Sequence, residues 1–219
     1  MGPGAWHSDR CAQRKASPRL FQNSLLDRLS RVHHFVPLLL YCPVVVGLLF
    51  AASRTVQAIP VLVAFAGGYL LWTLVEYLGH RFLFHYRPAT ASGLRLQYLI
   101  HGVHHAHPDD FLRLVMPPLM SLPIIAAAGT VLRALCGPAL FMPALAGFVA
   151  GYLAYDMLHF HIHHRRPRSS LERLLRYRHM YHHFRDDSCC YGVSAPWWDV
   201  VFGTRPMPGL RSRKSAAAE

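Results

Sequence analysis

The sequence predicts an all-α integral membrane protein, with four transmembrane helices and a cytoplasmic histidine-rich helical cap that holds a dinuclear metal site. Three observations lead to this prediction. Four long apolar runs divide the 219 residues, the basic residues gather in polar segments on one side of those runs, and ten of the 16 histidines lie in short motifs beside them. A chain that is 53% hydrophobic and yet carries a net charge of +12 has to separate its apolar residues from its charges. A chain of this length is expected to form one domain.

Residues 1–34 are polar and basic, and they predict a cytoplasmic N-terminal segment that precedes the membrane domain. No small-residue cleavage site of a signal peptide is evident. For His7, His33 and His34 we expect surface or interfacial positions rather than a role as metal ligands.

The first two apolar runs lead to the first histidine motif. Phe35–Ala52 contains 18 uncharged residues, enough to cross a bilayer as a helix, and the prolines within it are tolerated in membrane helices. The second run covers residues 56–78 and continues to His80 and His85. These two histidines are five residues apart, which is about 140° around a helix of 3.6 residues per turn. We therefore expect them to share a site only if the helix bends or the metal lies off its end.

The polar interlude from Arg81 to Arg113 contains His101, His104 and His105, at positions i, i+3 and i+4. On an α-helix this spacing places three imidazoles on one face. Neutral imidazole is a common ligand of zinc, iron, copper and nickel, so the motif predicts half of a metal site. Taken alone, the motif is explained equally well by a solvated histidine cluster.

The third and fourth apolar runs cover about residues 114–134 and 139–159. Gly147 and Gly151 have the small-xxx-small spacing that allows two membrane helices to pack closely, although the glycines could equally be incidental. His159 and His163 follow at the end of the fourth run, and His179, His182 and His183 repeat the HxxHH spacing. We expect the membrane domain to cover residues 35–205, followed by a flexible tail over residues 206–219.

The distribution of charge predicts the topology. Of the 23 lysines and arginines, 21 lie before the first run, between the second and third, or after the fourth. The positive-inside rule makes this face cytoplasmic, and every histidine motif lies on it. Basic residues beside apolar runs indicate a membrane surface as the partner, not nucleic acid. Five cysteines without a CxxC motif argue against a zinc ribbon or a disulfide framework and fit a reducing compartment.

Ten histidines form the candidate ligand set, which is too many for one metal ion and suits two. They are His80, His85, His101, His104, His105, His159, His163, His179, His182 and His183. For His107, His161 and His164 we expect positions beside the metal or on the surface.

Glu76, Asp110 and Asp156 are the candidate acceptors for imidazole N–H groups, with salt bridges to nearby arginines as the alternative. Trp197 and Trp198 are expected to anchor the protein at the membrane interface.

The histidine spacing HX4H, HX2HH, HX3H, HX2HH resembles that of the membrane fatty acid hydroxylase and sterol desaturase superfamily. The resemblance covers about residues 70–205, through EYLGHRFLFH (76–85), HGVHH (101–105), YDMLHFHIH (155–163), HMYHHF (179–184) and YGVSAPWWDVVFGT (191–204). RLVMPP (113–118) is similar to the fatty acid 2-hydroxylase branch, which acts on sphingolipid acyl chains. In this superfamily the ten histidines match ligands of a dinuclear non-haem metal centre, with O2 as co-substrate.

The resemblance implies an O2-dependent di-iron monooxygenase that hydroxylates C2 of long acyl chains in fatty acids, ceramides or sphingolipids. Two iron ions are the expected cofactors, and zinc could replace them in isolated protein. The cytochrome b5 domain of fungal and animal members is absent from this sequence, so we expect a separate electron donor of the cytochrome b5 or ferredoxin type. The expected location is a bacterial inner membrane, or the endoplasmic reticulum of a eukaryote, with the active site in the cytoplasm.

Two alternatives remain open at this stage. A sterol or carotenoid hydroxylase, or a lipid desaturase, would share the histidine spacing. A membrane zinc-binding or transport protein would instead place polar ligands near the helix centres. The centres of these apolar runs contain no such ligands, which disfavours transport.

Overall fold

The computed structural model describes residues 14–206, and within that range the chain is helical, without a strand. The expectations for His7 and for the tail at 207–219 lie outside the described residues. The chain forms two compact units. The unit that we call the membrane unit contains Arg19–Val75 and Phe111–Leu158. Of the described residues, the histidine unit contains 14–18, Glu76–Asp110 and 159–206.

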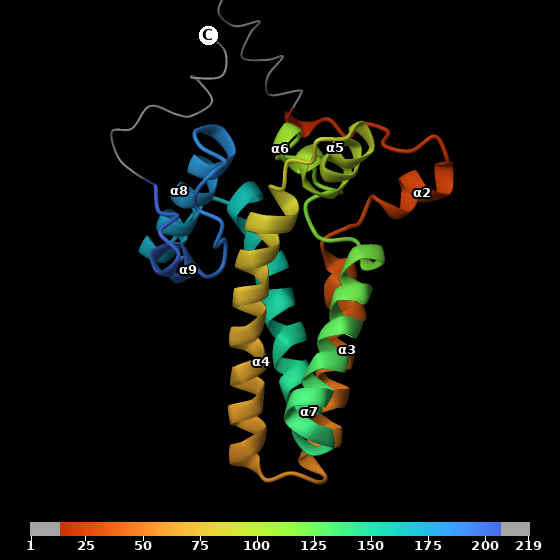
Figure 1. Cartoon of the computed structure of the whole chain (residues 1–219), viewed down its shortest axis with the longest axis vertical. Coiled ribbons are helices and arrows are strands. Elements are labelled where there is room, and N and C mark those ends of the chain that lie inside the picture. The colour runs from red at the N-terminus through yellow and green to blue at the C-terminus, as the bar shows by residue number, and fades with distance from the viewer. Residues whose placement is uncertain (1–13, 207–219) are drawn as a thin grey trace, which may run out of the picture. The chain divides into compact units, whose positions relative to one another are not determined.

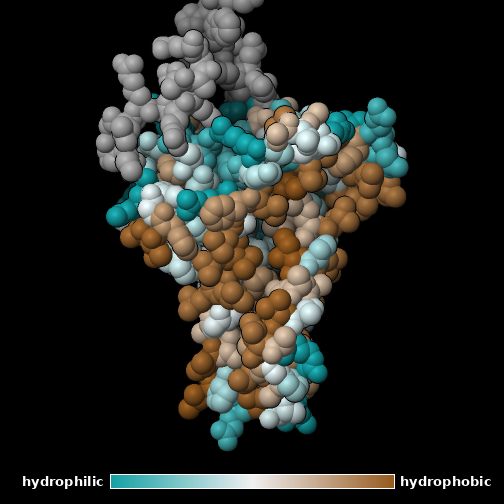
Figure 2. All heavy atoms as spheres, viewed as in Figure 1, coloured by the Kyte–Doolittle hydropathy of each residue, from teal (hydrophilic) through white to brown (hydrophobic). Residues whose placement is uncertain are grey.

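Within the described residues, three helices are long and apolar enough to cross a membrane, one fewer than the four expected, because the third and fourth apolar runs form a single helix. Helix α3 covers Phe35–Ser53, α4 covers Ala58–Leu78 and α7 covers Pro118–His164. Hydrophobic residues predominate on the face of these helices seen in Figure 2. The short helix α2 (Ser24–Leu29) precedes them, and Asn23 caps it by accepting hydrogen bonds from Leu25 N and Leu26 N.

Helix α7 combines the third and fourth apolar runs and is interrupted at Gly137. The φ angle of Gly137 is 71°, in the left-handed region that glycine adopts without steric cost, and Pro138 follows it. The chain reverses its direction here (Figure 1). The two arms of α7 touch, since a Cβ atom built on Gly129 would lie 3.4 Å from the Leu145 side chain.

Glycines allow α4 and α7 to pack with their backbones in contact. A Cβ atom on Gly68 would lie 1.8 Å from the carbonyl oxygen of Ala144, and one on Gly147 would lie 1.9 Å from that of Phe65. A Cβ atom on Gly151 would lie 2.8 Å from the Trp72 side chain. The prediction that Gly147 and Gly151 permit close helix packing is therefore confirmed.

The histidine unit is built from short helices. Two π-helical segments, Gly79–Phe84 and Tyr98–Gly102, lie directly after α4 and after α5 (Ala91–Gln97). Helix α6 is Val103–Ala106, α8 is Ser170–Phe184 and α9 is Trp197–Val201. The hydroxyl oxygens of Thr90 and Ser169 cap α5 and α8 by accepting from Gly93 N and Glu172 N.

The adjacent glycines Gly67 and Gly68 provide a matched test of the helix packing. Gly68→Ala should destabilise the protein by about 1–3 kcal/mol, because the new methyl group meets a backbone oxygen that no rotamer change can move. Gly67→Ala has open space at its Cβ position and should be neutral or slightly stabilising. Thermal unfolding of both variants in detergent checks the prediction, and equal melting temperatures would contradict it.

Candidate metal centre

All ten predicted ligand histidines converge in the histidine unit, where they form two groups of five. Group one consists of His80, His85, His101, His105 and His182. Group two consists of His104, His159, His163, His179 and His183. Within each group the candidate ligand atoms all lie within 4.8 Å of one another, close enough to surround one metal ion.

A π-helical turn brings His80 and His85 together. His85 N donates to His80 O over 3.2 Å, an i to i+5 hydrogen bond that defines a π-helix. The wider turn places residues five apart on nearly the same face, and the two ring centroids are 5.0 Å apart. The two histidines are therefore brought together by a π-helical turn and not by a bend of the helix. The HX4H spacing could have suggested such a turn.

The two HxxHH motifs are each divided between the groups, so the expectation that three imidazoles of one motif share a site was wrong. His101 and His105 belong to group one, whereas His104 belongs to group two. In α8, His179 and His183 belong to group two, whereas His182 belongs to group one. At about 100° per residue, positions i and i+4 lie about 40° apart, but neighbouring positions point in clearly different directions. Each motif therefore contributes to both groups.

The Nε2 atoms converge on two points. In group one, the Nε2 distances are 3.2 Å between His80 and His101, 3.0 Å between His101 and His105, and 3.0 Å between His85 and His182. In group two, Nε2 of His179 lies 2.9 Å from that of His159, 2.8 Å from His163 and 3.0 Å from His183. One neutral imidazole has a single N–H, so five convergent rings cannot satisfy one another by hydrogen bonding. A metal ion at each point would accept all the lone pairs at once.

Burial keeps these rings neutral. Loss of solvation, supported by repulsion from the neighbouring imidazoles, lowers the pKa of His101, His104, His179 and His183 well below its usual value. The pKa of His105 is lowered for the same reasons. Because only neutral imidazole binds a metal, the groups are ready to hold ions near neutral pH.

Backbone carbonyls, rather than two of the three expected carboxylates, bind the imidazoles. His80 Nδ1 lies 2.7 Å from Tyr191 O, and His182 Nδ1 lies 2.7 Å from Cys189 O. Sequence reasoning missed both contacts because every residue has a carbonyl group, so this acceptor leaves no signal in the side chains.

The carboxylates make other contacts. Glu76 accepts hydrogen bonds from Ser194 N at 2.8 Å and from the Ser194 hydroxyl. Asp156 belongs to the membrane unit, where Met116 N donates to it over 3.2 Å. Asp110 is buried, and its role stays a prediction.

Three described histidines outside the ligand set, His33, His34 and His161, also lie outside the two groups. His161 Nε2 lies 3.5 Å from the Glu172 carboxylate in a partly exposed ion pair. His33 and His34 pack their rings against Phe111 in the membrane unit. His33 is exposed and His34 and His161 are half-buried, which agrees with the surface or interfacial positions expected for them.

Comparisons with known proteins point to one family. The family model described as fatty acid hydroxylase matches residues 65–204. The dihydroceramide fatty acyl 2-hydroxylase FAH2 of Arabidopsis thaliana is 37% identical over 198 residues, which are 89% of this chain and 82% of that protein. The fatty acid 2-hydroxylase of Rattus norvegicus is 32% identical, and the match covers 85% of this chain and 56% of that longer protein.

A solved structure shares the fold. It is described as full-length scs7p with only the hydroxylase domain visible, and it superposes with a TM-score of 0.82 at 33% identity. The match covers 88% of this chain and 73% of the solved one. The ceramide very long chain fatty acid hydroxylase scs7 of Schizosaccharomyces pombe is 34% identical over 90% of this chain and 58% of its own length.

Neighbouring histidines provide a test of the division into two groups. His104→Ala and His105→Ala each remove one ligand, but from different groups. At a metal concentration too low to fill a weakened group, each variant should therefore bind about one ion per chain fewer than the wild-type protein. The double variant should lose both ions. Elemental analysis of purified protein measures the content, with His161→Ala as the control that keeps it unchanged. If the single variants lose both ions together, the ten histidines form one shared site.

Proposed function

Because the chain belongs to the fatty acid hydroxylase family, we propose that it is a membrane-bound di-iron fatty acid 2-hydroxylase. Its reaction inserts one oxygen atom of O2 into a C–H bond at C2 of a long acyl chain, and two electrons and two protons convert the other oxygen atom to water. The observation that carries this proposal is the pair of five-histidine groups within one compact unit. The names of the relatives, which include fatty acid and ceramide 2-hydroxylases, give the position of attack.

The ten histidines would hold the two ions, and the chemistry of the reaction favours iron. Iron with open coordination positions supplies oxygen activation when bound, whereas zinc fits the same imidazoles but has no redox chemistry. The protein orients the ligands and keeps water away from them, since His80, His179 and His182 are each at most 3% exposed. We propose that a separate donor of the cytochrome b5 or ferredoxin type supplies the electrons.

The substrate that we propose is the acyl chain of a fatty acid or a ceramide. Support comes from where the ligands lie along the chain. His80 follows the last residue of α4 by two positions, and His159 and His163 are in the last turns of α7. Each is thus placed where an apolar helix gives way to polar sequence, the depth at which a lipid carries its head group. An acyl carbonyl held there leaves C2 as the first methylene group available to the metal.

For the topology we propose four membrane crossings, with both termini and the histidine unit in the cytoplasm. The interruption of α7 at Gly137 supports two crossings within that helix. The excess of basic residues outside the apolar runs supports the cytoplasmic assignment. We assign the hydroxylase domain to residues 35–205 and favour a bacterial inner membrane as its location.

Lipid analysis tests the reaction. Cells that express the chain under ¹⁸O2 should accumulate 2-hydroxy fatty acids carrying one ¹⁸O atom, detected by mass spectrometry after lipid hydrolysis. His182→Ala should abolish this product because it removes a group-one ligand, while His161→Ala should leave it unchanged. Unsaturated or mid-chain hydroxylated acids in place of the 2-hydroxy product would indicate a desaturase or another hydroxylase of the same superfamily.

Cysteine labelling tests the topology. Replacement of Cys11, Cys42 and Cys136 leaves only the buried Cys189 and Cys190. One further cysteine is then introduced at a time, as Arg54→Cys or Ser215→Cys, and a membrane-impermeant maleimide is applied to sealed vesicles. With four crossings, position 54 is labelled in right-side-out vesicles and position 215 in inverted ones. Labelling of both positions from the same side rules out the four-crossing topology.

A further inference from the structure

The two histidine groups differ in the hydrogen-bond partners of the Nδ1 atoms of their rings. In group one, His80 and His182 each have Nδ1 at 2.7 Å from a backbone carbonyl of the segment between α8 and α9. In group two, the Nδ1 atoms of four rings are buried and have no hydrogen-bond partner in the described chain. These four are His104, His163, His179 and His183. Two sites with similar ligands therefore have unequal support.

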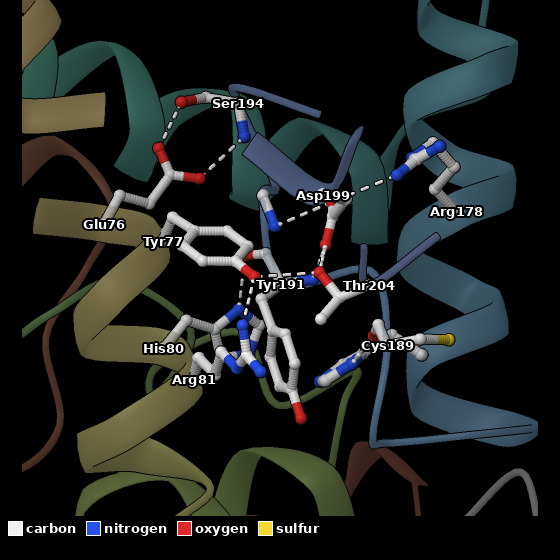
Figure 3. A network of polar contacts seen from close by, with 12 residues as sticks. Glu76, Tyr77, His80, Arg81, Arg178, Cys189, Tyr191, Ser194, Asp199 and Thr204 are labelled. Atoms are coloured by element: carbon white, nitrogen blue, oxygen red, sulfur yellow. Dashed lines mark hydrogen bonds and ion pairs between the residues drawn. The ribbon is translucent and has the colours of Figure 1, made fainter. Parts of the chain in front are cut away.

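The supporting segment, residues 189–196, is fixed by the carboxylate of Asp199 (Figure 3). Asp199 is completely buried, and four donors contact it. Tyr191 N donates over 2.8 Å and Gly192 N over 3.1 Å, while the Thr204 hydroxyl donates over 2.7 Å and the Arg178 guanidinium over 3.0 Å. The carboxylate thus binds the amide group of the same residue, Tyr191, whose carbonyl holds His80.

Two further contacts fix the remaining parts of the segment. Cys190, between the two residues that supply the carbonyls, has a φ angle of 59°, and its N–H donates to Thr204 O over 2.9 Å. A left-handed conformation at a non-glycine residue persists only where the surrounding contacts determine it. At the other end, Glu76 of α4 accepts the hydrogen bonds from Ser194. The geometry of both carbonyls is therefore set by contacts that do not involve the metal.

A carbonyl at Nδ1 prepares an imidazole for metal binding. Donation from Nδ1–H to the carbonyl places the proton on that nitrogen, leaves the Nε2 lone pair free and fixes the ring plane. A ring without such a partner can rotate or change tautomer, so part of the binding free energy is used to order it. Loss of such an outer contact typically costs roughly 10–100-fold in metal affinity.

We propose that Asp199 is a positioning residue that pre-organises group one through residues 189–196, so that group one retains its metal ion longer than group two. The proposal rests on the two-metal site of the proposed function. According to this proposal the two groups release their ions at different rates, slowly from group one and faster from group two.

Chelator-driven release of zinc from the zinc-loaded full-length protein in detergent tests this inequality. The wild-type protein should release its two ions in two phases whose rates differ at least about ten-fold. His104→Ala, which disrupts group two, should retain the slow phase, and His105→Ala, which disrupts group one, should retain the fast phase. These two variants assign each phase to its group.

Asp199→Asn keeps the size of the side chain but removes its charge and replaces one acceptor oxygen with an amide donor. It should accelerate the slow phase roughly 10–100-fold and leave the fast phase unchanged. Glu172→Gln is the matched control, because this α8 carboxylate contacts His161 and Arg168 N but not the supporting segment. If Asp199→Asn does not fold, Thr204→Val removes one of the four donors and should produce a smaller acceleration of the same phase.

The outcomes separate this inference from the function. Failure to bind two ions would overturn the proposed di-metal site itself. Two bound ions that leave at one rate in the wild-type protein would overturn only the inequality between the groups. Equal acceleration of both phases by Asp199→Asn would show that Asp199 supports the fold in general and does not position group one.

Discussion

The central constraint on this structure is the convergence of ten imidazole rings, eight of them buried, in two tight groups. A buried polar group without a partner costs free energy, and convergent lone pairs also repel. Neutral rings reduce this cost, and burial lowers the histidine pKa values in the direction that keeps the rings neutral. Metal ions remove the cost by accepting the lone pairs. The histidine unit is therefore a fold that metal binding is expected to stabilise.

Local helix geometry distributes the ligands. The π-helical turn at Gly79–Phe84 aligns His80 with His85, and the i, i+4 pairs of α6 and α8 each face one group while the intervening histidine faces the other. As a result, α6 and α8 contribute to both groups, whereas α7 contributes only to group two.

Hydrogen bonds from outside the ligand set support group one and make the two groups different. Carbonyl groups of residues 189–196 hold rings of group one, and Asp199 fixes that segment from outside. The family relationship supplies the reaction, acyl-chain hydroxylation, and the histidine groups supply the place for it. The membrane unit contributes long apolar helices whose glycine-mediated contacts keep the backbones close.

The sequence by itself determined the helical membrane character, all ten candidate ligands and the family. The length of an apolar run and the spacing of histidines are local properties, so both can be read along the sequence without knowledge of tertiary contacts. Only the tertiary structure decided how the ligands divide. His104 and His105 are neighbours in sequence yet face different groups, since their directions depend on helix phase and on which partners lie opposite. The π-helical turns and the carbonyl contacts to His80 and His182 were also decided there. They arise from backbone hydrogen bonds, from the pairing of His80 with a carbonyl 111 positions later and from that of His182 with a carbonyl seven positions later, and no residue type marks any of these contacts.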